Sequence, residues 1–101
     1  MIEIIQSKTF RKWLAHLGDR QARAIIASRL RPLSLGISGD SSAIGDAISE
    51  LRIHFGPGYR LYYIRHGTSI VVLLSGEDKS TQRRDIDNAK AIAREWRTNH
   101  D

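Results

Sequence analysis

Cysteine is absent from this chain of 101 residues. A disulfide framework, a thiolate metal site and a cysteine nucleophile are therefore excluded. The chain has four histidines, but none shows the close spacing of a metal motif such as H-E-x-x-H. We therefore expect no metal ion and no other cofactor.

Long hydrophobic runs are missing as well. No stretch approaches the ~18 apolar residues that a membrane-spanning helix needs. The first ten residues contain Glu3 and only a short apolar run, which is unlike a signal peptide. These features predict a cytoplasmic protein without a membrane partner.

Positive charge is present in excess, with 16 Lys and Arg against 11 Asp and Glu and a net charge of +5. Such an excess favours a nucleic acid or an acidic protein as partner, although a generically soluble basic protein fits it almost as well. The hydrophobic fraction of 41% is typical of a globular chain. At this length the default is a single domain over residues 1–101.

The first half of the chain predicts one strand and a helical hairpin. Residues 2–6 are apolar and β-branched, which favours a strand. Helical spacing follows from Ser7 to a glycine at position 18, and again from Asp19, with an end or kink near residue 31 because a proline follows. The stretch 34–46 is rich in Ser, Gly and Asp, and we expect a surface loop there.

The second half predicts three strands and a final helix, because the hydrophobic period changes to two and then returns to helical spacing. The expected strands are residues 48–55, 59–65 and 70–74, with turns at 56–58, 66–68 and 75–76, and the expected helix is 81–97. The element order βααβββα predicts an α+β domain with a three-stranded meander.

Strand alternation places Glu50, Arg52 and His54 on one face of the first of these strands, and Arg60 and Tyr62 together on the next. A tight turn at 56–58 would bring His54 and Arg60 close together. A neutral imidazole can accept a proton near neutral pH, and arginines can hold a phosphate. Cleavage of RNA through its 2′-hydroxyl uses this combination, but a solvent-exposed outer sheet face is the common alternative.

Two further groups of basic residues are candidates for RNA or ribosome binding. Lys79, Arg83 and Arg84 surround the expected start of the last helix, where anions are attracted. Arg11 and Lys12 belong to the basic helical hairpin. The simpler alternative is helix capping with solvated charges for the first group and a solvated helix face for the second.

Two segments of the sequence resemble a known family. Residues 49–63, SELRIHFGPGYRLYY, and residues 73–82, LLSGEDKSTQ, resemble the addiction-module killer proteins of the RelE/ParE toxin superfamily, in its phage-derived, HigB-like branch. In that family the pattern E-L-R-I-x-x-G-P-G-Y-R-V-Y precedes a hydrophobic strand and G-x-D-K-S-T-Q. Two motifs at the expected separation make the resemblance specific.

The resemblance implies a RelE-like fold, in which the first strand joins an antiparallel sheet, with an N-terminal helical hairpin and a C-terminal helix. It implies the toxin of a type II toxin–antitoxin system. The expected activity is that of a metal-independent mRNA endoribonuclease (an mRNA interferase) that acts with the ribosome and inhibits translation. The expected partners are the ribosome, mRNA and a cognate antitoxin, commonly a helix-turn-helix protein. By motif, Arg60 matches the family's strand arginine, and Arg52 and His54 match its preceding basic pair, so these three are the expected catalytic residues.

One departure from the family keeps other functions open. Some RelE-like nucleases use a tyrosine near the C-terminus for proton transfer, and the expected last helix of this chain has none. Either His54 takes that role, or the mechanism depends mainly on substrate positioning. The alternatives are a ParE-like inhibitor of DNA gyrase and a non-catalytic toxin-like protein that binds an antitoxin. The oligomeric state stays open between a homo-oligomer and a toxin–antitoxin heterotetramer.

Overall fold

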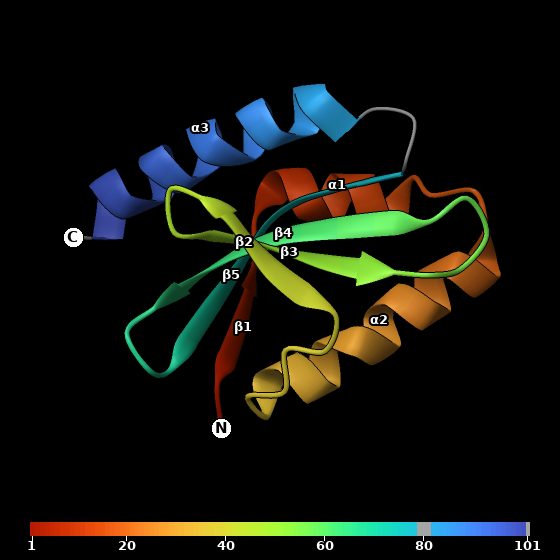
Figure 1. The fold of residues 1–101 in the computed structure, drawn as a ribbon, viewed down its shortest axis with the longest axis horizontal. Helices are drawn as coiled ribbons and strands as arrows, with labels where there is room; N and C mark the ends of the chain where they lie inside the picture. Colours follow the sequence, from red (N-terminus) through yellow and green to blue (C-terminus); the bar gives the residue numbers. More distant parts are fainter. Residues whose placement is uncertain (79–81, 101) are drawn as a thin grey trace.

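The computed structural model is an α+β fold with a five-stranded sheet and three helices (Figure 1). It describes residues 1–78 and 82–100, and the side chains of all of these except 82–85. In chain order the elements are β1 (Glu3–Gln6), α1 (Lys8–Ala15), α2 (Arg20–Ser34), β2 (Ser41–Gly45), β3 (Ile48–Ile53), β4 (Tyr59–His66), β5 (Ile70–Asp78) and α3 (Gln82–His100).

The sheet has the strand order β1-β5-β4-β3-β2. Strands β2 to β5 form an antiparallel meander, and β1 pairs with β5 in parallel, so the sheet is mixed rather than purely antiparallel. The predicted α+β class, the helical hairpin and the C-terminal helix are confirmed. Helices α1 and α2 lie between β1 and the meander in the sequence, and the four-residue β1 forms one edge of the sheet.

The prediction of a surface loop over residues 34–46 is wrong for its second half, which forms β2. The element order is therefore βααββββα rather than βααβββα. A two-residue turn joins β2 to β3, and its residues Asp46 and Ala47 have φ values of 54° and 60°, as a type I′ hairpin turn requires. Because β2 is an edge strand that buries little of its surface, its composition resembles that of a loop.

The predicted turn at residues 75–76 is also wrong, because β5 continues to Asp78. Gly76 lies against Trp13 of α1, and a Cβ atom at this position would come within 2.3 Å of the Trp13 ring. The glycine thus allows close packing between the strand and the helix.

The helical hairpin begins where the sequence indicates. Ser7 caps α1 by accepting a hydrogen bond from the amide of Phe10 at 2.9 Å, and Asp19 caps α2 in the same way. The sequence predicts an end or a kink of α2 near residue 31, and an end there is wrong, because the helix continues through Pro32 to Ser34. Pro32 lies in the last turn, and the continuation buries Leu33 completely.

The sheet has a hydrophobic core on each face. Helices α1 and α2 cover one face, where Phe10, Ile26 and Leu61 are fully buried. Helix α3 covers part of the other through Ala89 and Ala93. None of the helices in the described ranges is long and apolar enough to cross a membrane. Glu50, Arg52, Arg60 and Tyr62 lie on the face that α3 covers in part.

Candidate active site

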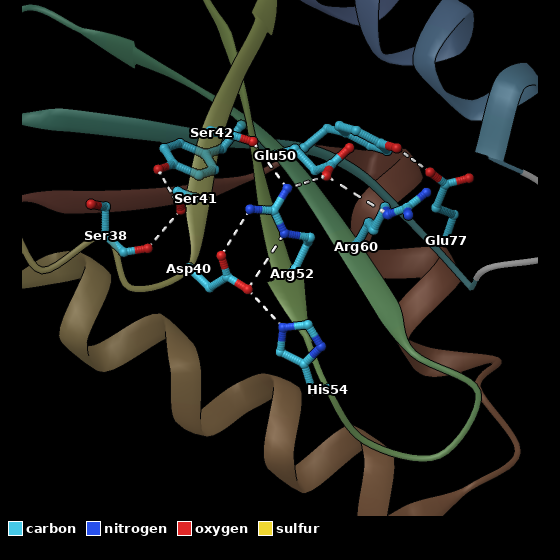
Figure 2. Close-up of polar contacts among 11 residues, drawn as sticks. Ser38, Asp40, Ser41, Ser42, Glu50, Arg52, His54, Arg60 and Glu77 are labelled. Carbon is cyan, nitrogen blue, oxygen red and sulfur yellow. Dashed lines mark hydrogen bonds and ion pairs between the residues drawn. The ribbon is translucent and has the colours of Figure 1, made fainter.

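The predicted catalytic arginines lie directly opposite each other. The β3–β4 register pairs Arg52 with Arg60 and Glu50 with Tyr62, so all four side chains share one face. Figure 2 shows Glu50, Arg52 and Arg60 on this face. His54 follows the end of β3. A pocket of about 140 Å³ is lined by Arg52, His54 and Arg60 together with Ile53, Gly58 and Tyr59. The structure therefore brings the three predicted residues together, with Arg60 opposite Arg52 rather than opposite His54.

Asp40 joins Arg52 to His54, as Figure 2 shows. Its Oδ1 accepts a hydrogen bond from Arg52 Nη2 at 2.8 Å, and its Oδ2 lies 2.6 Å from His54 Nε2. Arg52 Nη1 also donates to Ser42 Oγ at 3.1 Å. Asp40 lies just before β2, so the hairpin of β2 and β3 carries it to the site.

The contact with Arg52, followed by that with His54, lowers the pKa of Asp40 from 3.8 to about 2. The same hydrogen bond raises the pKa of Arg52. Asp40 is therefore an acceptor at neutral pH, and His54 must donate its Nε2 proton to it. In the neutral ring this leaves Nδ1 as the proton acceptor, and the His54 side chain is 77% exposed to solvent.

Glu50 lies between the two arginines and is only 6% exposed. Its Oε1 accepts a hydrogen bond from Arg52 Nη1 at 3.2 Å and lies 3.7 Å from Arg60 Nε. Arg60 Nη1 is buried and has no hydrogen-bond partner among the described residues. The buried carboxylate therefore stabilises both guanidinium groups, while Arg60 keeps one unused donor.

Tyr62 and Glu77 form a buried pair beside this group. The Tyr62 hydroxyl donates a hydrogen bond to Glu77 Oε1, and burial followed by this bond raises the pKa of Tyr62. Glu77 faces Tyr62 because the β4–β5 pairing passes from Tyr62–Ser75 to Tyr63–Leu73, which leaves Leu74 as an extra residue in β5. Tyr62 therefore keeps its proton and cannot act as a base near neutral pH.

The charge of this face differs from the expected basic surface. Two guanidinium groups, of Arg52 and Arg60, lie among three carboxylates, of Asp40, Glu50 and Glu77. With a neutral imidazole the group carries no positive excess. Glu50, Tyr62 and Glu77 are buried, whereas Asp40 and His54 are exposed, so the face is only partly open to solvent.

Two of the remaining predicted residues, Arg11 and Lys12, do not join this site. They are exposed on α1, which packs on the opposite face of the sheet. Lys79 and the side chains of Arg83 and Arg84 lie outside the described residues. Within the part of the chain that the structure describes, no three histidine or acidic side chains form a group that could hold a metal ion.

No family model matches the sequence. An uncharacterized protein of Haemophilus influenzae is 44% identical to it over 94 residues. The aligned region covers 93% of this chain and 95% of the Haemophilus influenzae protein, so the similarity extends over both proteins almost from end to end.

Proposed function

The chain belongs to the same family as the Haemophilus influenzae protein, and we propose that it is the toxin of a type II toxin–antitoxin system. In this proposal its fold is RelE-like, and it inhibits translation as a ribosome-dependent mRNA endoribonuclease. The proposal rests on one observation. Arg52 pairs with Arg60 at a pocket that His54 also lines, and Asp40 orients the His54 ring through a hydrogen bond. The two sequence motifs support the choice of toxin family.

His54 takes the proton of the RNA 2′-hydroxyl on Nδ1 in this mechanism. The 2′-oxygen then forms a bond to the adjacent phosphorus, and the bond from phosphorus to the 5′-oxygen of the next nucleotide breaks. A proton from His54 or from water completes the leaving hydroxyl, and a 2′,3′-cyclic phosphate remains. Asp40 keeps Nε2 protonated and stabilises the imidazolium that forms.

The arginines stabilise the charge that grows on the phosphate oxygens. Arg60 Nη1 can donate a hydrogen bond to a phosphate oxygen without giving up an existing one, once the side chain turns toward the pocket. Arg52 is already bonded to Asp40 and Glu50, so it holds the site together more than it binds substrate. The ribosome supplies the remaining positioning of mRNA.

A second candidate function is favoured by the balanced charge of the site. Carboxylates already neutralise Arg52 and lie close to Arg60, which suits a protein that binds a partner without cutting RNA. Such a protein would inhibit DNA gyrase or would only bind its antitoxin. Both versions keep the fold and lose the nuclease chemistry.

Pulse labelling in bacteria after induction of the gene separates these functions. The nuclease proposal predicts that incorporation of labelled amino acids stops first while incorporation of thymidine continues. Early failure of DNA synthesis with continuing translation would establish the gyrase alternative. Normal growth with a well-folded protein would leave only the binding function.

The proposed partner is a cognate antitoxin of the helix-turn-helix class, encoded next to the toxin gene. An acidic surface on it would increase the association rate and the specificity for this basic chain. We expect the two products to co-purify and the complex to be inactive. A toxin that stays fully active with the adjacent gene product in excess would contradict this pairing.

A further inference from the structure

A second charged pocket lies between α3 and the β2–β3 turn. Its volume is about 470 Å³, and it is lined by Asp46, Ala47, Lys90, Arg94 and Arg97. Figure 1 shows this turn beneath the C-terminal half of α3, at the end of β3 away from the Gly-Pro-Gly turn. None of these residues belongs to the two sequence motifs or to the candidate active site.

The three cations share one face of α3 because they are spaced by four and three residues. Arg97 Nη2 donates a hydrogen bond to the Asp46 carbonyl oxygen at 2.8 Å, which fixes its guanidinium beside the turn. Lys90 Nζ lies 4.0 Å from the Asp46 carboxylate, which is 56% exposed. Arg94 is exposed and makes no ion pair or hydrogen bond through its side chain with the described residues.

The pocket therefore has an unbalanced charge, with three cations against one carboxylate. Its only apolar lining side chain is that of Ala47. A docking site for a protein normally has an apolar centre with aromatic residues, which is missing here. Contacts to nucleic-acid phosphates need only cationic and polar groups.

We propose that Lys90, Arg94 and Arg97 form a binding site for the phosphate backbone of single-stranded nucleic acid, separate from the Arg52–Arg60 site. Helix α3 covers the sheet face that carries the active-site residues, so both sites open on the same side of the sheet. Arg52 lies five positions after Ala47 along β3, or roughly 17 Å at the usual rise of a strand. One RNA strand of a few nucleotides can contact both.

The choice of RNA rather than DNA rests on the proposed function, whereas the phosphate chemistry does not. The test is therefore a binding measurement that involves neither ribosomes nor cleavage. Fluorescence anisotropy reports the affinity of the protein for a short labelled uridine oligomer, and for a thymidine deoxy-oligomer of the same length, over a series of salt concentrations.

The test variant is Lys90→Ala with Arg94→Ala. Loss of two phosphate contacts lowers the slope of log affinity against log salt by ~1.4 for a single strand, which is roughly 25-fold weaker binding at about 0.1 M salt. The matched control is Arg29→Ala with Arg31→Ala, which removes two exposed arginines of α2, the helix that packs on the opposite face of the sheet from α3. We expect the control to bind within about twofold of the unaltered protein, because distant surface charges are screened by salt.

RNA and DNA oligomers should respond equally, because phosphate contacts carry no base information. Equal affinity and equal salt slope in the test variant and the control would overturn the inference. So would a variant that loses binding of a poly-glutamate peptide and keeps its binding of RNA, since the pocket would then serve an acidic protein. Failure of the cleavage function leaves this binding result unchanged, so the two proposals fail separately.

Discussion

Two guanidinium groups and three carboxylates share the polar face of β3 and β4, whereas three cations and one carboxylate surround the pocket beside α3. In the first region the charges bond to one another and several are buried. In the second, Lys90 and Arg97 both contact Asp46, while Arg94 is exposed and has no side-chain partner among the described residues. The excess of cations in the α3 pocket therefore contrasts with the balanced charge of the group around Arg52 and Arg60. Charge that is fixed internally suits chemistry on a held phosphate, and exposed unbalanced charge suits capture of a polyanion.

Of the substitutions that test this difference, Arg60→Ala should cause the largest loss of activity. Removing a preorganised charge-stabilising group costs ~10²–10³-fold in rate, so induction of this variant should no longer arrest growth. Arg60→Lys keeps the charge and the ion pair with Glu50 but lacks the planar guanidinium, and intermediate toxicity is expected. Colony counts after induction measure both, with circular dichroism as the check of folding. Full toxicity of folded Arg60→Ala would contradict the catalytic assignment.

Substitutions of His54 and Asp40 should cause the next largest losses of cleavage rate, and the loss should be larger for His54. His54→Ala removes the base and lowers ribosome-programmed mRNA cleavage on the order of 10²-fold. Asp40→Asn keeps the imidazole but loses the charged acceptor of Nε2, so we expect on the order of tenfold. Steady-state cleavage rates on programmed ribosomes give the readout. Two variants with full activity would show that proton transfer occurs elsewhere.

The two regions should also differ in how much their charged side chains contribute to the stability of the protein, and Glu50 tests this for the buried region. Glu50→Gln leaves two guanidinium groups without their shared carboxylate, and the free energy of unfolding should fall by about 2 kcal/mol, less than for a fully buried pair because Arg52 is partly exposed. Arg94→Ala, in the exposed pocket, should change it by no more than about 0.5 kcal/mol. Urea denaturation measures both. Equal effects would remove the distinction between the two regions.

The smallest effect is an acid dependence due to Asp40. Its pKa in the folded protein is lowered from 3.8 to about 2, so the folded state binds this proton less readily than the unfolded chain. The resulting stabilisation is present above about pH 4 and is lost as the pH falls toward 2. The free energy of unfolding, measured by urea denaturation between these pH values, should fall more steeply with decreasing pH for the unaltered protein than for Asp40→Asn. An equal dependence on pH would show that the Asp40–Arg52 contact adds no stability.

The sequence predicts much of this arrangement, because alternation along two strands and the Gly-Pro-Gly turn together place Arg52, His54 and Arg60 on one face. Asp40 could not be predicted. It reaches the site only because residues 41–45 form an edge strand, and their Ser- and Gly-rich composition resembles that of a loop. Its approach to Arg52 is a tertiary contact between residues twelve positions apart.

Glu77 and Gly76 escaped prediction for a different reason. Simple alternation from Leu74 would place Glu77 on the opposite face, and only the extra residue in β5 turns it toward Tyr62. In the sequence Gly76 resembles a turn residue. Its absent side chain instead leaves room for the ring of Trp13, and this ring comes from α1, far away in the sequence. Local patterns predict elements and faces, but not bulges or packing between distant segments.

If chemistry occurs on the β3–β4 face while the α3 pocket captures the RNA backbone, substitutions at the two sites should change different quantities. Single-turnover cleavage of mRNA on programmed ribosomes, followed over a range of toxin concentrations, measures both the rate and the affinity. Arg60→Ala should lower the rate at saturating toxin by ~10²–10³-fold. Lys90→Ala with Arg94→Ala should keep that rate and raise the toxin concentration needed for half of it. An unchanged saturating rate in folded Arg60→Ala, or an equally large loss of rate in the α3 variant, would show that the two regions do not divide chemistry from binding.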